Sequence, residues 1–216
     1  MQPKYGDKDV KIIDETIVYE GFHRIKRLRL QHKLYDGSWS AAIDREILDR
    51  GSSASVVVYD PILDAVCLVE HIRIATLQAK QADSSAWSTE IVAGMIDKED
   101  ESPEQVVRRE LFEEAGLRAD YLEKITSYWV TPGGSSARMH IYVALCDLSD
   151  AGGIYGLDYE HEDILALIEP LKTVYQSALV DESSNAATLI GLQWLTLNRE
   201  RMYYIWHAQH GKQGEL

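Results

Sequence analysis

Hydrophobic and polar residues alternate along residues 9–50, which is typical of extended strands. The pair Asp36-Gly37 separates two such stretches and indicates a hairpin turn. This segment is mostly strand and too short to bury both faces of a sheet by itself. We therefore expect it to pack against another part of the protein or against a second subunit.

From residue 54 onward the pattern mixes strands with a few helices. The β-rich runs ASVVVYD and AVCLVEHIRI are separated by a turn at Asp60-Pro61. The remaining elements are a helix from Ser102-Pro103 to Gly116, strands at about 121–130, 138–147 and 164–168, an acidic loop at 150–163, and helices at about 170–180 and 185–207. This order predicts an α/β (α+β) sandwich with a mixed sheet. We expect an N-terminal strand region at 1–53 and one main domain at 54–216.

Composition narrows the classes of function. The net charge is −13 over 216 residues, which argues against a nucleic-acid partner because binding to phosphates needs a basic face. A small phosphorylated substrate stays possible if divalent cations lie between its phosphates and the carboxylates of the protein. Cys67 and Cys146 both lie in apolar runs, as expected for buried thiols in a reducing cytoplasm. We find neither a signal peptide nor a run long enough to span a membrane.

The segment from Gly94 to Leu117 carries the strongest chemical signal. Ser102, Pro103 and Gln105 form a helix start with a capping box, and Gly116 suits the position just after the helix.

Within this helix Glu110, Glu113 and Glu114 are spaced i, i+3 and i+4 and therefore share one face. Their mutual repulsion is removed if Mg²⁺ binds there, since Mg²⁺ prefers oxygen ligands. Arg109 is placed to orient one carboxylate through a two-point contact. The alternative is an ordinary solvated helix face.

The pattern E-x7-R-E-U-x-E-E-x-G-U, where U is apolar, fits from Glu101 to Leu117 without a mismatch. It resembles the Nudix box, G-x5-E-x7-R-E-U-x-E-E-x-G-U. One departure is that six residues, not five, separate Gly94 from Glu101. We interpret this as an insertion around residues 98–100 that leaves the helical ligands in register.

Nearly the whole chain resembles the bacterial ADP-ribose pyrophosphatase group of Nudix hydrolases. The similar segments are DREILDRG, VCLVEHIRI, EIVAGMI, the box, TPGGSS, GLDYEHEDI and NAATLIGLQWL. Pro132 also lies 16 residues after Gly116, a spacing typical of this group. The resemblance implies an α/β/α sandwich and Mg²⁺-dependent hydrolysis of ADP-ribose to AMP and ribose 5-phosphate, with Mn²⁺ as a possible substitute.

The resemblance also implies a metal site and a catalytic loop. The metal ligands would be the carbonyl of Ala93 and the side chains of Glu110, Glu114 and Glu113. In the acidic loop, Glu160 would be the general base that activates water, and Glu162 a metal-facing residue or alternative base. Glu113 and Arg109 would support catalysis. A carboxylate on a loop can complete such a site when substrate binds. The alternative for residues 158–163 is a solvated acidic turn.

Further positions resemble the substrate contacts of this group. Arg45 and Arg73 would bind phosphate, Phe22 would stack on adenine, and Gly133 lies in the TPGGSS loop. The alternatives are surface ion pairs for the two arginines and a core position for Phe22. Ala137 departs from the pattern, because relatives carry Glu there. If that Glu contacts the terminal ribose, its absence changes affinity or substrate choice.

The N-terminal strands of this group exchange between two subunits, so the resemblance implies a homodimer that acts on a small nucleoside diphosphate sugar. Two alternatives stay open. One is a pyrophosphatase for GDP-mannose or another nucleoside diphosphate sugar. The other is a sensor that binds ADP-ribose without cutting it, although such a domain tends to lose the carboxylates that this helix retains.

Overall fold

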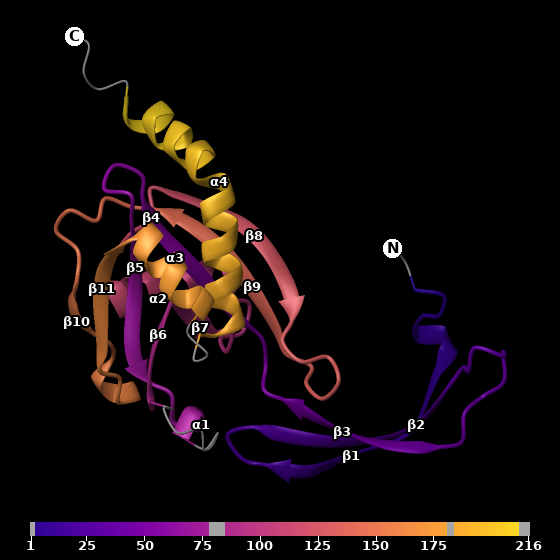
Figure 1. The fold of residues 1–216 in the computed structure, drawn as a ribbon. Coiled ribbons are helices and arrows are strands. Elements are labelled where there is room, and N and C mark those ends of the chain that lie inside the picture. The colour runs from indigo at the N-terminus through magenta and orange to yellow at the C-terminus, as the bar shows by residue number, and fades with distance from the viewer. Residues whose placement is uncertain (1–2, 78–84, 181–183, 212–216) are drawn as a thin grey trace. The chain divides into compact units, whose positions relative to one another are not determined.

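A computed structural model describes residues 3–77, 85–180 and 184–211. The chain divides into two compact units (Figure 1). The first comprises Met1–Ser52 and Tyr128–Arg138, and the second comprises Ser53–Ser127 and Met139–Leu216. The segment 128–138, which the sequence analysis assigned to the main domain, therefore packs with the N-terminal strands.

The first unit is built on a three-stranded antiparallel sheet. After a short 3-10 helix, η1 (Asp7–Asp9), the strands are β1 (Val10–Glu20), β2 (Arg24–His32) and β3 (Ile43–Asp49), in the order β1-β2-β3. The turn expected at Asp36-Gly37 is present, and the positive φ of Gly37 (+91°) is one that glycine adopts without strain. Leu48 of β3 also exchanges backbone hydrogen bonds with Gly134 and Ser136, which ties the segment 128–138 to this sheet.

The second unit contains a mixed sheet of eight strands. They are β4 (Ser53–Asp60), β5 (Ala65–Ile72), β6 (Trp87–Glu90), β7 (Val92–Met95), β8 (Tyr121–Trp129), β9 (Arg138–Leu145), β10 (Gly153–Tyr155) and β11 (Ile164–Pro170). The order is β10-β11-β5-β4-β9-β8, with β6 paired to β5 and β7 paired to β4. Strands β4 and β9 are parallel, whereas β4 and β5 are antiparallel. The predicted mixed sheet is confirmed.

Helices cover both faces of this sheet. The helical elements of this unit are α1 (Ile74–Leu77), α2 (Pro103–Ala115), the 3-10 helix η2 (Asp158–Glu160), α3 (Leu171–Val180) and α4 (Ala186–His210). Val56 and Val58 of β4 belong to the buried cluster that includes Leu111 of α2. Val57 points to the opposite face, where it packs close to Gly191 of α4. The α/β/α sandwich is therefore confirmed (Figure 1).

The ends of α2 follow from its local sequence. The Ser102 hydroxyl accepts a hydrogen bond from the Gln105 backbone N–H at 3.3 Å, and the Gln105 side chain accepts one from the Ser102 N–H at 2.8 Å. Gly116 ends the helix with a left-handed φ of 67°. The predicted capping box and glycine stop are confirmed, and they fix where the glutamates of this helix begin and end.

The structure also contains short elements that the sequence pattern did not predict, among them η1, α1, β10 and η2. Each has three or four residues, too few for a periodic pattern to show. No helix among the described residues is long and apolar enough to cross a membrane.

Candidate active site

The carboxylates of α2 meet the end of β7. Glu114 is only 3% exposed, and its Oε2 accepts a hydrogen bond from the Ala93 backbone N–H at 3.1 Å. A Cβ placed on Gly94 would lie 1.8 Å from Oε1 of Glu110, so only glycine permits this close approach. The Ala93-Gly94 backbone therefore lies directly against two of the three predicted carboxylate ligands.

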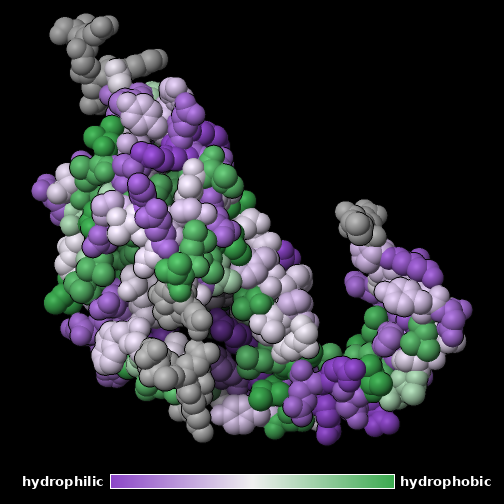
Figure 2. All heavy atoms as spheres, in the orientation of Figure 1, coloured by the Kyte–Doolittle hydropathy of each residue, from purple (hydrophilic) through white to green (hydrophobic). Residues whose placement is uncertain are grey.

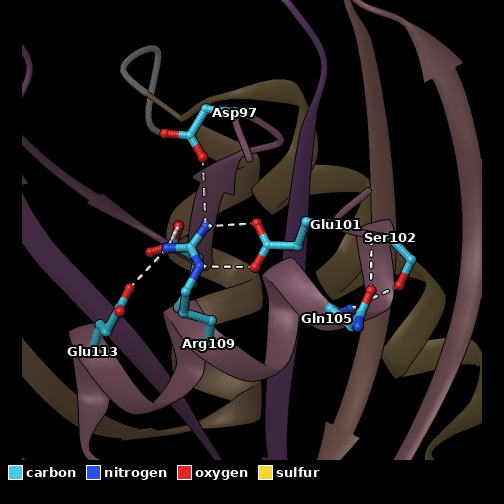
Figure 3. A network of polar contacts seen from close by, with 7 residues as sticks. Asp97, Glu101, Ser102, Gln105, Arg109 and Glu113 are labelled. Atoms are coloured by element: carbon cyan, nitrogen blue, oxygen red, sulfur yellow. Dashed lines mark hydrogen bonds and ion pairs between the residues drawn. The ribbon is translucent and has the colours of Figure 1, made fainter. Parts of the chain in front are cut away.

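Arg109 holds the surrounding carboxylates together (Figure 3). Its guanidinium makes a two-point contact with Glu101, at 3.0 and 3.2 Å, and its Nη1 donates to Glu110 at 2.7 Å and to Glu113 at 2.8 Å. Asp97 lies at 3.9 Å. The two-point contact expected of Arg109 is thus made with Glu101, and the pKa of Glu101 is lowered chiefly by this hydrogen bond.

Glu110 and Glu114 are buried enough to resist ionisation. Burial raises the pKa of Glu110 to about 7, although the charge of Arg109 opposes the shift. Burial also raises the pKa of Glu114 to about 8 against the hydrogen bond from Ala93, with Glu110 and Glu162 adding repulsion. A site that concentrates negative charge out of water in this way favours a cation.

The acidic loop contributes unevenly to this charge cluster. Glu162 acts electrostatically on both Glu110 and Glu114, and its Oε2 accepts a hydrogen bond from Leu157 N–H at 3.3 Å. Glu160 is exposed on η2. The structure therefore brings Glu162 close to the carboxylates of α2, while Glu160 lies on the solvent side of the same loop.

The extra residue before Glu101 is absorbed by a tight turn. Asp100 has a positive φ of 64°, and Glu101 N–H donates to the Lys98 carbonyl at 3.2 Å. Asp and Asn tolerate this conformation better than most residues. The turn leaves Glu101 within reach of Arg109, so the insertion does not disturb the network.

The residues of this site lie within a region that matches a known protein family. Residues 49–179 match the family model described as the NUDIX domain. The chain belongs to the NUDIX domain family.

Full-length relatives of this NUDIX protein include two named ADP-ribose pyrophosphatases. The chain is 38% identical to the one from Haemophilus influenzae, over 94% of this chain and 93% of that protein. It is 40% identical to the one from Escherichia coli strain K12, over 94% and 95%. A GDP-mannose pyrophosphatase from Cronobacter sakazakii is 28% identical, over 88% and 96%.

A solved structure titled "Crystal structure of ADP compounds hydrolase" shares the fold of the NUDIX protein. The TM-score is 0.63 at 21% identity, covering 88% of this chain and 96% of the other. At this identity the likeness shows the fold alone.

The donor set of the NUDIX box fits a hard divalent cation. Glu110, Glu114 and the Ala93 backbone offer oxygen atoms within one small region, which is the ligand type that Mg²⁺ prefers. Within the described residues, however, no three acidic, His or Cys side chains are already arranged as a metal-binding group. Arg109 instead donates to one oxygen each of Glu110 and Glu113, and the second oxygen of each carboxylate does not contact Arg109.

Arg73, predicted to bind substrate, directly follows β5. Its charge partly offsets the rise in the pKa of Glu114, and its guanidinium contacts the buried Glu90 at 3.0 Å. Glu90 was not among the residues predicted from the sequence. The hydrophobic pattern carries no signal for it, because in this strand the apolar Trp87 is exposed while Ser88 and Glu90 are buried.

The other predicted substrate contacts belong to the first unit. Arg45 is exposed on β3, and Gly133 lies in the segment 128–138. Phe22 follows β1 and is 88% exposed, so the core alternative for this residue is wrong. Ala137 is only 2% exposed and therefore offers no side chain to a ligand. The roles of Arg45, Phe22 and Gly133 stay predictions.

Proposed function

We propose that this NUDIX protein is an ADP-ribose pyrophosphatase that hydrolyses ADP-ribose to AMP and ribose 5-phosphate with Mg²⁺, or Mn²⁺ in its place. The observation that carries the proposal is the meeting of Glu110 and Glu114 with the Ala93-Gly94 backbone. The named ADP-ribose pyrophosphatases at 38–40% identity over nearly the full chain support this choice of substrate.

Glu110, Glu114 and the Ala93 carbonyl are the proposed metal ligands, with Glu113 ligating or supporting. The bound ion would neutralise the diphosphate and polarise its phosphorus–oxygen bonds. Arg109 fixes Glu101 and Glu113, which keeps the flanking carboxylates in place.

Glu160 is the proposed base that removes a proton from the attacking water, and Glu162 is the alternative. Exposure of Glu160 is compatible with this role, because a loop carboxylate can enter the site when substrate binds. Glu162 is near enough to Glu110 and Glu114 for its charge to raise their pKa values, which supports it as the alternative. Arg73 is the proposed phosphate contact in the second unit, and Arg45, Phe22 and Gly133 are proposed contacts from the first.

The first test is turnover of ADP-ribose with Mg²⁺, with and without EDTA, and identification of the products by chromatography. Metal-dependent AMP and ribose 5-phosphate are expected. GDP-mannose is tested alongside as the alternative substrate, because the relative from Cronobacter sakazakii at 28% identity is named a GDP-mannose pyrophosphatase. Faster turnover of GDP-mannose would replace the proposed substrate, and binding of ADP-ribose without cleavage would favour a sensor.

We also propose a homodimer that forms through the N-terminal strands. Every residue of β1 is exposed, including Ile12, Ile13, Ile17 and Val18 on both faces of the strand. Figure 2 shows such hydrophobic residues at the surface of this unit. Exposed apolar strands of this kind mark an interface.

The dimer is tested by light scattering at micromolar concentration. Ile17→Lys is expected to give a monomer, because it places a charge on the apolar strand, while Lys11→Gln on the same strand is expected to stay dimeric. A wild-type monomer would contradict the proposal. A cytoplasmic location stays a prediction.

A further inference from the structure

A second network of charged residues, outside the NUDIX box, lies beside the carboxylate site. Its centre is Glu90 at the end of β6, which is 6% exposed. Glu90 pairs in register with Val69 of β5, and Ser88 pairs with His71. Because residues directly opposite each other in an antiparallel pair point to the same face, Glu90 lies on the sheet face that carries Val69, and this face packs against α2.

Glu90 holds Arg73 through a two-point contact. Nε and Nη2 of Arg73 lie 3.2 and 3.0 Å from Oε2 of Glu90, and Nε also lies 3.4 Å from Oε1. His71 lies near the same carboxylate, with its Nε2 at 3.7 Å from Oε2. This is too long for a hydrogen bond, and Nε2 of His71 has no hydrogen-bond partner among the described residues.

The contact with Glu90 leaves part of the Arg73 guanidinium free to donate further hydrogen bonds. Its side chain is 43% exposed, and no described residue accepts a hydrogen bond from its Nη1. One edge of the guanidinium is therefore fixed to a buried carboxylate, while Nη1 on the other edge makes no hydrogen bond to a described residue.

We infer that Glu90 is a positioning residue that fixes the Arg73 guanidinium, so that its open edge binds a phosphate oxygen of the diphosphate substrate. The inference rests on the proposed function, which makes Arg73 a phosphate contact. An arginine side chain loses considerable rotamer freedom when it binds. The contact with Glu90 restricts the rotamers of Arg73 when the protein folds. The substrate then binds an arginine whose orientation is already set.

The experiment is a double-mutant cycle of Glu90→Gln and Arg73→Gln. Each single variant is expected to raise KM and the Kd for ADP-ribose about tenfold with little change in kcat, as for an interaction that substrate and transition state share. The double variant is expected to be no worse than Arg73→Gln, because Glu90 acts only through Arg73. The Kd is measured by calorimetry in EDTA, so it does not depend on turnover.

Two further variants separate positioning from stability. Glu90→Asp keeps the carboxylate and is expected to recover part of the affinity. Arg73→Lys keeps the charge without the planar fork, so it is expected to lose affinity as Glu90→Gln does. This result is informative even if Glu90→Gln does not fold.

The matched control is Glu123→Gln. It breaks another glutamate–arginine pair, with Arg201 at 2.6 Å, and is expected to leave KM and Kd unchanged. A merely structural Glu90 would lower the melting temperature while Kd stayed at the wild-type value, and that outcome would overturn the inference. Full additivity of Glu90→Gln and Arg73→Gln, or wild-type affinity in Arg73→Lys, would also overturn it.

The outcomes also distinguish this inference from the proposed function. Wild-type protein that binds ADP-ribose without cleaving it would contradict the pyrophosphatase, while the Kd cycle would still decide the role of Glu90. Cleavage of ADP-ribose with an unchanged Kd in Glu90→Gln would support the pyrophosphatase and reject the positioning role.

Discussion

Replacement of Glu114 by Gln should affect the fold and the reaction in opposite directions. Glu114 is buried with a pKa raised to about 8, chiefly by burial. A carboxyl whose pKa is higher in the folded state contributes stability that is fully present below its unfolded value and is lost as pH rises through the folded value. In metal-free wild type this loss spans about pH 4.5 to 8.

The size of the effect follows from the shift. The pKa of Glu114 is about 8 in the folded protein, against a usual value of 4.5, which is a difference of about 3.5 pKa units. At 1.36 kcal/mol per unit, ionisation of Glu114 lowers the free energy of unfolding by at most about 5 kcal/mol. Gln does not titrate, and its amide oxygen can still accept the hydrogen bond from Ala93. Metal-free Glu114→Gln is therefore expected to be more stable than wild type at pH 8–9 and similar at pH 5.

The assay is urea unfolding in EDTA across this pH range, with turnover of ADP-ribose measured in parallel. Turnover is expected to fall at least about 100-fold, as for loss of a charged group that stabilises the transition state. Glu104→Gln is the control, because Glu104 is an exposed residue of α2 that pairs with Arg108. The same pH dependence of stability in wild type and Glu114→Gln would refute the electrostatic reasoning, and wild-type turnover would refute the metal site.

Three other predictions follow from single residues. Glu160→Gln is expected to lower kcat by about 100-fold or more with a smaller change in KM, since a general base acts mainly in the transition state. If Glu162→Gln shows this loss of kcat and Glu160→Gln does not, Glu162 is the base. The nearby imidazole of His71 and the hydrogen bonds from Arg73 hold the pKa of Glu90 below its usual value despite its burial, so its stabilising contribution is present above about pH 4.5 and lost in acid. Acid unfolding of Glu90→Gln should therefore be less steep than that of wild type, and identical slopes would contradict this. Ser102→Ala removes one side of the capping box and should lower the unfolding free energy by about 1 kcal/mol in urea titrations, whereas Ser102→Thr should retain most of it.

The local sequence determined the parts of the site that depend on neighbours along the chain. The helix from Pro103 to Ala115 was predicted with its cap, its glycine stop and its row of glutamates. These features come from spacings of three or four residues, which helical geometry converts directly into contacts. The mixed sheet was also predictable, because its strands carry strong β patterns and are separated by clear turns.

The tertiary structure decided which distant residues meet these glutamates. Gly94 against Glu110, Glu90 with Arg73, and the segment 128–138 beside β3 are all contacts between separate elements. Strand pairing and packing set such contacts, and no periodicity along the chain encodes a pairing partner. Glu114 shows both contributions in one residue. Its position on the helix follows from the spacing of residues along the sequence. Its raised pKa comes from burial and from neighbouring charges, which arise only when the chain folds.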